Sequence, residues 1–297
     1  MIAQAGQKAP FALLPQTTPA VEAPQFISHT ASPVSPEKVR LHAEVGRYRL
    51  RLAQGFEDRE AACRLRFKVF NIELGEGLKR SYETGIDTDH FDVFCEHLLV
   101  EDKADGRVVG TYRMQSGSTA AMNLGYYSEQ EFEFAPYEPL RRDILELGRA
   151  SIDREHRTPE VLTLLWRGIA QYANEMGLRY LIGCSSLHSK DPAEGWQMYG
   201  ELERYRVSPE FETLPTSPYE CPSEQQGRDT QISSDPENPA VPTKVPKLLK
   251  TYLTIGARIC APPAWDREFG TIDFLTLLDL KMLSSAARNR FLAPLTQ

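Results

Sequence analysis

The sequence predicts an α/β (α+β) fold in which helices flank a mixed, mostly antiparallel sheet. Segments of alternating apolar and polar residues, which are typical of half-buried strands, are interspersed with segments of helical periodicity. The strand predicted at 145–152, the long helix after it and the strand predicted at 178–186 form a crossover. The three strands in the middle of the chain form a meander.

The N-terminal half of the sequence predicts a disordered tail, a strand, a helix and a hairpin. Residues 1–43 are rich in Pro, Ala, Thr and Ser and are predicted to be a disordered tail, which leaves 44–297 as the folded domain. The alternation in "GRYRLRLA" at 46–53 predicts a strand, and an apolar stripe predicts a helix at 57–74. An acidic loop at 84–94 precedes "EHLLVEDK" and "RVVGTYRM", which flank "ADG" and predict a hairpin.

The long helix has the strongest boundary signals in the chain. Thr158 is suited to cap it, Pro159 fits its first position, and Gly177 ends it. After it the sequence predicts a buried strand at 178–186, a shorter helix at 192–205 and a long, partly disordered loop or insertion at 207–246. Two late strands at 248–260 and 271–280 and an amphipathic terminal helix at 281–292 complete the chain.

Composition excludes several classes of function. A net charge of -7 and a pI near 5.5 argue against nucleic acid as a partner, because phosphate binding needs clustered positive charge. Five scattered cysteines without a CxxC pair indicate a reducing compartment rather than disulfides or a zinc site. The chain has no apolar run long enough to span a membrane and no signal peptide, so a cytoplasmic protein is expected.

Several motifs in a fixed order carry a family resemblance. They are "RLRFKVF" (64–70), "DTDHFD" (87–92), "HLLV" (97–100), "VVGTYRM" (108–114), "ELGRASI" (146–152), "LLWRGIAQY" (164–172), "YLIGCSSL" (180–187), "LLKTYLTIGA" (248–257) and "DREFGTIDF" (266–274). With them the chain resembles the GNAT N-acyltransferase superfamily, and most closely its ornithine-lipid N-acyltransferases and related "haemolysin-like" acyltransferases. It is distantly similar to the acyl-homoserine-lactone synthases. The resemblance implies a GNAT-like sheet with splayed central strands.

The resemblance also implies a reaction. A long-chain acyl group, plain or 3-hydroxylated, would move from acyl carrier protein to the α-amine of ornithine, giving a lyso-ornithine lipid. The co-substrate would be an acyl-phosphopantetheine thioester, with no tightly bound cofactor and no metal. Two alternatives remain open at this point: an acyltransferase for another amino acid or amine, and a catalytically silent module that binds acyl carrier protein or lipid.

Glu146 is the first candidate for catalysis. An amine must lose a proton before it attacks a thioester, and a nearby carboxylate can accept that proton. The alternative is an ion pair of Glu146 with Arg149 or Arg113 that braces the sheet. Arg149 follows at i+3, so on an ideal strand it points to the opposite face. The two residues share a site only if a β-bulge separates them, which Gly148 permits.

The acidic loop contributes candidates for binding the amino-acid substrate. Asp87 and Asp89, together with Arg66, match positions that are important in the acyl-homoserine-lactone synthases that the chain resembles. The loop would hold the cationic side of a basic acceptor. Alternatively it caps a turn, or pairs with Arg64, Arg66 and Lys68. A metal is not expected there, because no further ligand cluster lies near these aspartates in the sequence.

The segment before the long helix departs from the superfamily pattern Q/R-x-x-G-x-G/A. Arg157 matches, but both glycines are missing. Pro159 removes an N–H donor and Glu160 adds a negative charge, so the cradle for a pyrophosphate is incomplete. Acyl carrier protein, with one phosphate, is therefore preferred to coenzyme A as donor. Arg154 and Arg157 would contact it, unless they are solvated surface charges.

Three hydroxyl groups complete the candidate site. Tyr199 resembles the position of a general-acid tyrosine in the superfamily, although a core tyrosine is the alternative. Ser185 and Ser186 end a strand that should splay from that of Glu146, where they meet the acyl carbonyl or cap a turn.

The acyl chain needs an apolar tunnel. Five aromatic residues are candidates for lining it, unless they belong to a loop packed on the sheet: Tyr126, Tyr127, Phe132, Phe134 and Tyr137. The basic and apolar stretch at 281–292 is a candidate for peripheral contact with the inner membrane, or else a docked terminal helix.

Overall fold

A nine-stranded sheet forms the centre of the computed structural model, which describes residues 39–223, 245–283 and 287–289. The strands are β1 (His42–Val45), β2 (Tyr48–Leu52), β3 (Glu96–Asp102), β4 (Val108–Ser116), β5 (Ile144–Ile152), β6 (Tyr180–Leu187), β7 (Arg258–Ile259), β8 (Ala264–Asp266) and β9 (Thr271–Asp279). Their order is β1-β2-β3-β4-β5-β6-β9-β7, with β8 paired to β9. Among the named strands of the described residues, only β5 and β6 pair in parallel, which confirms the mostly antiparallel sheet.

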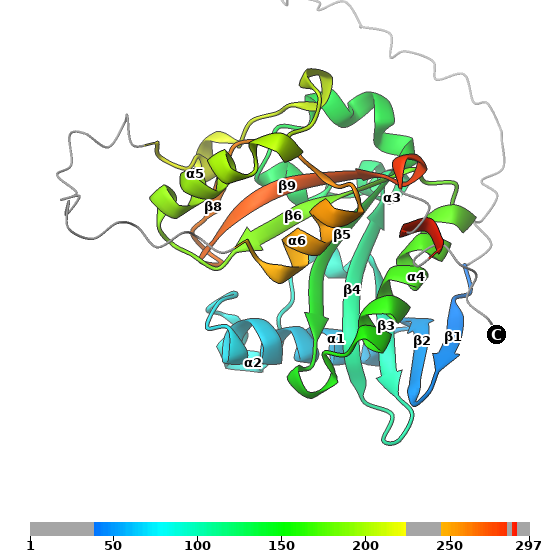
Figure 1. The fold of residues 1–297 in the computed structure, drawn as a ribbon. Coiled ribbons are helices and arrows are strands. Elements are labelled where there is room, and N and C mark those ends of the chain that lie inside the picture. Colours follow the sequence, from blue (N-terminus) through cyan, green and yellow to red (C-terminus); the bar gives the residue numbers. More distant parts are fainter. Residues whose placement is uncertain (1–38, 224–244, 284–286, 290–297) are drawn as a thin grey trace, which may run out of the picture. The chain divides into compact units, whose positions relative to one another are not determined.

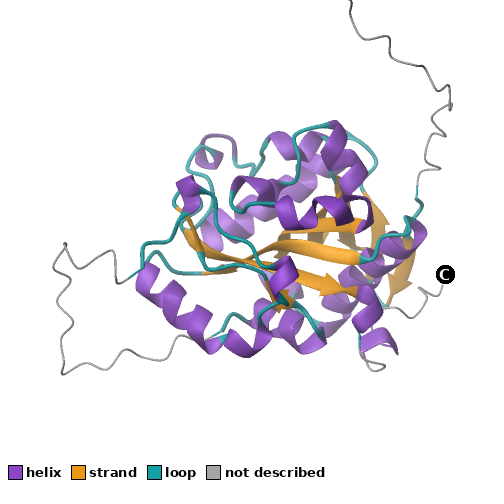
Figure 2. Ribbon diagram, turned by 90° about the horizontal axis from the view of Figure 1, so that it is seen from above, coloured by secondary structure: helices purple, strands orange, loops and turns teal. Residues whose placement is uncertain are grey.

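Helices cover both faces of this sheet (Figures 1 and 2). They are α1 (Phe56–Phe67), α2 (Ser81–Thr84), α3 (Gly117–Met122), α4 (Pro159–Glu175), α5 (Pro192–Glu201) and α6 (Lys247–Ile255). The long helix α4 begins as its sequence predicts: Thr158 Oγ1 accepts the N–H of Val161, and Pro159 occupies the first turn. Its apolar face packs against β2, β3 and β4, and α1 packs against β3, β4 and β5. No helix in the described parts of the chain is both long and apolar enough to span a bilayer.

The central strands β5 and β6 pair only at one end. Ile144, Leu145 and Glu146 face Tyr180, Leu181 and Ile182, and beyond these pairs the strands diverge (Figure 1). The splayed central strands of the predicted fold are therefore present. Gly183 lies at the point of divergence, where a β-carbon would stand 2.2 Å from the carbonyl oxygen of Leu147. A glycine is required there because the two backbones approach so closely.

A β-bulge lies in β5 next to this divergence. On β4, Thr111 pairs with Ser151 and Arg113 pairs with Gly148, so β5 carries one extra residue between these pairs. Arg149 has a φ of 53°, the only positive φ outside glycine among the described residues. For a residue with a side chain this conformation costs about 1–2 kcal/mol. The bulge brings Arg149 to the sheet face that carries Glu146. Such a bulge, permitted by Gly148, was the expected condition for the two residues to share a site.

One element was predicted wrongly. Residues 248–260 were expected to form a strand, but they form helix α6 and the short strand β7. The apolar residues Leu249, Tyr252 and Leu253 recur at helical spacing and face the core, and Gly256 ends the helix in a left-handed conformation. Short apolar runs of this kind are compatible with both a strand and a helix, and packing against β6 selects the helix.

Other predicted boundaries shift by smaller amounts. The helix expected at 57–74 becomes π-helical from Lys68 to Glu73, and that expected at 192–205 ends as α5 at Glu201. Residues 207–223 of the expected insertion form isolated bridges: Pro215 pairs with Phe132, outside the sheet, and Glu220 pairs with Ala264 in β8. The predicted tail, apart from its last residues, lies outside the described residues, as do 224–244 of the insertion and most of 281–292.

The close approach at Gly183 gives a test of the fold. Replacing Gly183 with Ala should lower the free energy of unfolding by about 1–3 kcal/mol, because the new methyl group meets a backbone carbonyl that cannot move alone. Gly148→Ala is the matched control on β5, since no atom lies within 4 Å of its added carbon, and its change should stay within about 0.5 kcal/mol. Urea denaturation measures both, and an equal loss in the two variants would contradict this explanation.

Candidate active site

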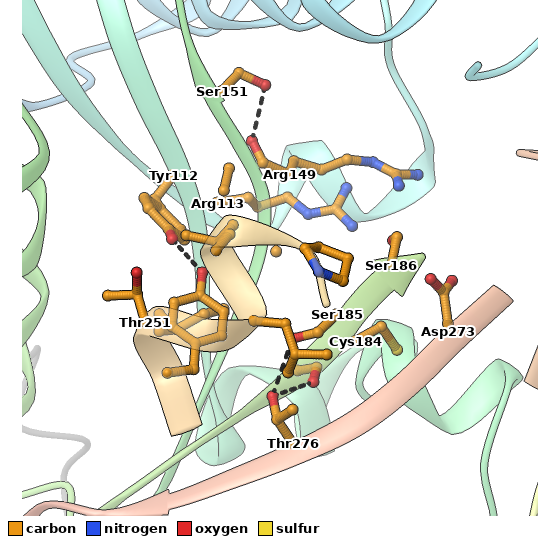
Figure 3. A pocket seen from close by; sticks show the side chains of 18 of the residues that line it. Tyr112, Arg113, Arg149, Ser151, Cys184, Ser185, Ser186, Thr251, Asp273 and Thr276 are labelled. Carbon is orange, nitrogen blue, oxygen red and sulfur yellow. Dashed lines mark hydrogen bonds between the residues drawn. The ribbon is translucent and has the colours of Figure 1, made fainter. Parts of the chain in front are cut away.

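The divergence of β5 from β6 opens a cavity of about 800 Å³. One part of its wall is apolar and comes from β5, α4 and α6, with Leu147, Ile152, Leu162, Trp166, Leu249 and Tyr252. Another part is polar, with Arg113, Arg149, Ser185, Ser186 and Asp273 (Figure 3). Glu146 also lines this part. A cavity of this size, largely apolar with a few polar groups, is typical of a small-molecule site.

Glu146 is held by the loop that follows α3. Its Oε2 accepts the N–H of Tyr127 at 2.9 Å, and its Oε1 accepts the N–H and the hydroxyl of Ser128, both at 2.7 Å. No ion pair joins it to Arg113 or Arg149 in the described residues. Burial raises the pKa of Glu146 above its usual range, although the Ser128 and Tyr127 donors act in the opposite direction. The side chain is therefore a fixed carboxylate with a raised proton affinity.

Three arginines and three aspartates form a second buried group between α1 and the sheet. Arg66 donates to Asp87 at 2.8 Å and to Asp92 at 2.7 Å. Arg113 and Arg149 both donate to Asp89, at 2.6 and 3.1 Å. All six side chains are at most about one-tenth exposed, and their charges balance. The network consists of Arg66, Asp87, Asp89, Asp92, Arg113 and Arg149.

Burial alone would raise the pKa values of Asp89 and Asp92. The positive charges of Arg66 and Arg113 nevertheless hold the pKa of Asp92 well below its usual range. Arg113 and Arg149 likewise lower the pKa of Asp89. Both aspartates are therefore ionised at neutral pH, and the network is a set of full charges in which each group is balanced.

Arg149 connects this network to the cavity. Its guanidinium lies 4.8 Å from the ring centre of Tyr127 and 4.6 Å from that of Phe269. Its Nε has no hydrogen-bond partner among the described residues, and the residue lines the cavity. In Figure 3 the guanidinium groups of Arg113 and Arg149 extend toward the side on which Ser186 and Asp273 lie. Arg149 thus offers a positive charge with donor capacity to a ligand.

The structure brings some of the sequence-predicted site residues together at the cavity. Glu146, Arg149, Ser185, Ser186 and Arg157 all line it. Ser185 Oγ lies 3.4 Å from Thr276 Oγ1 on β9. Arg157, just before α4, forms an ion pair with Glu73.

Other predicted residues do not reach the cavity. Arg66, Asp87 and Asp89 lie in the charge network, and Asp89 also caps the turn His90–Val93. The loop therefore caps a turn and pairs with Arg66, whereas Arg64 and Lys68 pair with Glu60 and Asp153. Arg154 is exposed on the turn before α4. Tyr199 lies on α5 against Trp196 and Arg206, away from the lining residues.

Two features of the cavity were missed in the sequence. The helix α6 forms part of the apolar wall, whereas of the five aromatic candidates only Tyr127 lines the cavity; the others pack in a separate core. A second acidic group also lies here: Asp266 and Asp273 line the cavity, and Glu131, which does not line it, is buried beside them. Asp266 and Asp273 belong to the motif "DREFGTIDF", which was the available signal, but Glu131 is far away along the chain.

Comparison with known proteins places these observations in context. Residues 65–167 match the family described as "Acetyltransferase (GNAT) domain". The chain is 31% identical to the L-ornithine N(alpha)-acyltransferase of Brucella abortus (strain 2308), with 83% of this chain and 92% of that protein covered. It is 29% identical to the enzyme of the same name from Rhodobacter capsulatus, with 81% and 93% covered. The solved structure of the acyl-homoserine-lactone synthase LasI has 10% identity and a TM-score of 0.46, with 84% and 97% covered.

The charge network makes a prediction about stability. Arg66→Ala should lower the free energy of unfolding at pH 7 by about 3–5 kcal/mol, because Asp87 and Asp92 remain buried without that partner. Arg64→Ala, on the same helix, removes only the exposed pair with Glu60 and should cost less than about 1 kcal/mol. Guanidinium denaturation compares the two variants, and similar midpoints would contradict the role given to the network.

Proposed function

The chain belongs to the family of the L-ornithine Nα-acyltransferases, and from this premise we propose that its acceptor is the α-amine of ornithine. The chain is an amide-forming acyltransferase, which removes the silent binding module from consideration. The proposed donor is a long-chain acyl group, plain or 3-hydroxylated, on acyl carrier protein, and the proposed product is a lyso-ornithine lipid.

The observation that carries this proposal is the position of Glu146. A buried carboxylate of raised pKa stands on the polar wall of a cavity whose remaining wall is apolar. An acyl chain fits the apolar part beside α4 and α6, which brings its thioester to the divergence of β5 and β6. An amino acid fits the polar part. The two substrates then meet at Glu146.

The chemistry follows from these positions. Glu146 accepts a proton from the α-ammonium, and the free amine attacks the thioester carbonyl carbon. The negative oxygen of the tetrahedral intermediate receives hydrogen bonds from donors such as the hydroxyls of Ser185 and Ser186. The carbon–sulfur bond then breaks, the thiolate leaves as a thiol with the second proton that the attacking nitrogen loses, the amide remains, and Glu146 releases its own proton to water. Arg149 binds the α-carboxylate of the acceptor through its unpaired donors.

Arg66, Asp87 and Asp89 have an indirect part in this proposal. They fix Arg113 and Arg149 by charge pairing, and the network's charges already balance, so these residues are not proposed to bind a cationic substrate. Tyr199 has no part in the proposed chemistry, because it does not line the cavity.

Acyl carrier protein is the proposed donor because of the α4 N-terminus. Thr158 Oγ1 already accepts the N–H of Val161, Pro159 has no N–H, and Glu160 is negative. A pyrophosphate would find few donors there, whereas the single phosphate of phosphopantetheine needs fewer. Arg157 at the rim, with Arg154 on the preceding turn, supplies positive charge for that phosphate or for the acidic surface of a carrier protein.

The donor can be tested with the purified chain, ornithine, and the same acyl group on acyl carrier protein or on coenzyme A. We expect kcat/KM to be at least about tenfold higher with the carrier protein, since one charge-assisted hydrogen bond corresponds to that ratio. Mass spectrometry of the product identifies the acylated nitrogen. A higher kcat/KM with coenzyme A would contradict the proposed donor without affecting the proposed acceptor.

The role of Glu146 can be tested with Glu146→Gln. We expect kcat to fall about 10²- to 10⁴-fold, the range for loss of a general base. In the unchanged enzyme kcat should rise with pH through the raised pKa of Glu146 and level off above it, because only the ionised form accepts a proton. This acidic limb should be absent from the variant.

Glu129→Gln is the matched control. Glu129 lies on the loop that holds Glu146, but it pairs with Arg141 and does not line the cavity. The kcat of this variant should stay near that of the unchanged enzyme. A Glu146→Gln variant that folds normally and retains full activity would exclude Glu146 as the base.

A further inference from the structure

Three carboxylates from distant parts of the chain meet at one side of the cavity. Glu131 follows the turn Tyr127–Gln130, Asp266 ends β8, and Asp273 lies on β9. One carboxylate oxygen of each lies within 4.8 Å of the other two. Glu131 is 1% exposed, and Asp266 and Asp273 are each 4% exposed. We call these residues the distal acidic cluster.

The distal acidic cluster lacks a positive partner in the described residues. Among the described residues, the two carboxylate oxygens of Glu131 and the Oδ1 of Asp273 have no hydrogen-bond partner. No arginine, lysine or histidine among these residues forms an ion pair with Glu131, Asp266 or Asp273. Asp266 Oδ1 accepts only the N–H of Phe269, at 2.8 Å. The contrast with the balanced arginine–aspartate network is direct. Buried charge without a partner is costly, so these orphaned oxygens point to a cationic ligand.

Burial and crowding favour protonation of the cluster when it is empty. Burial raises the pKa of Asp273 to about 6 and, with the charges of Asp273 and Asp266, raises the pKa of Glu131 well above its usual range. A cation that enters the cluster would favour the ionised forms and so recover the electrostatic energy that burial costs.

The cluster adjoins the groups that the proposed reaction uses. Asp266 and Asp273 line the same cavity as Glu146 and Arg149. The Phe269 ring under the Arg149 guanidinium belongs to the residue whose N–H binds Asp266. On the other side, Cys184 Sγ lies 3.5 Å from Ser128 Oγ, which donates to Glu146. Cys184 and Ser186 lie on β6, where Ser186 pairs with Asp273 (Figure 3).

We propose that Glu131, Asp266 and Asp273 bind the distal ammonium group of a diamino-acid acceptor and thereby select it over neutral amino acids. This inference rests on the proposed function and names the residues that determine its acceptor. The two nitrogens of ornithine are roughly 6 Å apart when the chain is extended, by ordinary bond lengths. With Arg149 on the carboxylate and the cluster on the distal ammonium, the α-amine is directed to Glu146. A neutral side chain would leave the cluster unpaired.

The experiment compares ornithine with norvaline, which has the same carbon skeleton without the distal amine. The full-length enzyme is assayed with one acyl donor, and kcat/KM is measured for both acceptors in the unchanged chain, Asp273→Asn and Glu131→Gln. We expect both variants to lower the ornithine-to-norvaline ratio about ten- to hundredfold, as for loss of a charged hydrogen bond. The change should lie in KM for ornithine, with kcat/KM for norvaline unchanged. Calorimetric titration of the enzyme with each amino acid should show the same loss.

Asp279→Asn is the matched control, because Asp279 lies on the same strand and pairs with Arg179 outside the cavity. It should leave the ratio unchanged. Thermal unfolding shows whether the variants fold; both cluster variants should unfold at or above the temperature of the unchanged chain, since each removes one of three crowded, buried carboxyl groups that repel one another when ionised.

Each remaining outcome has a distinct meaning. Absence of transfer to either acceptor would refute the proposed function. Transfer to ornithine with an unchanged ratio in both cluster variants would overturn the inference alone, and so would an equal loss for both acceptors. Loss of activity with EDTA and its recovery with Mg²⁺ or Ca²⁺, at an unchanged ratio, would make the cluster a metal site instead.

Discussion

Pairing between β5 and β6 ends after Glu146 and Ile182, and the position of every group in the candidate site follows from this limit. If the two strands stayed paired, backbone hydrogen bonds would hold them side by side and no opening would form between them. Gly183 brings the backbones together at the last point of contact, and the strands then separate. The bulge at Arg149 is the second consequence, because it turns a charged side chain into the opening. A strained backbone at such a position is typical of a functional site.

Electrostatics divides the polar side of the cavity into two parts of different character. On the α1 side, the arginine–aspartate network is balanced and buried, so it fixes geometry. At β8 and β9, the distal acidic cluster has no counter-charge among the described residues. Arg149 stands between the two and carries donors that the network leaves unused. In the proposed function, the first part therefore positions groups and the second contacts the acceptor.

The sequence predicted those features that depend on local spacing. Glu146, the need for a bulge near Gly148 and the caps of α4 all lie within a short segment, where periodicity and turn chemistry apply. The helix α6 was not predicted, because its short apolar run is compatible with both a strand and a helix, and only packing selects the helix. Glu131 was not identified as a site residue for a different reason. Its partners follow it by more than a hundred residues, and only the tertiary fold brings them together.

The low polarity of the cavity explains why so few groups suffice to orient an acceptor. Charges interact more strongly away from water, so in the proposed function a single guanidinium and a few carboxylates are enough to discriminate between substrates that differ by one amine. The same burial raises the pKa of Glu146, which improves it as a base for an ammonium at neutral pH. Apolar walls thus serve both substrates of the proposed reaction: they hold the acyl chain by excluding water, and they strengthen every charge that holds the amino acid.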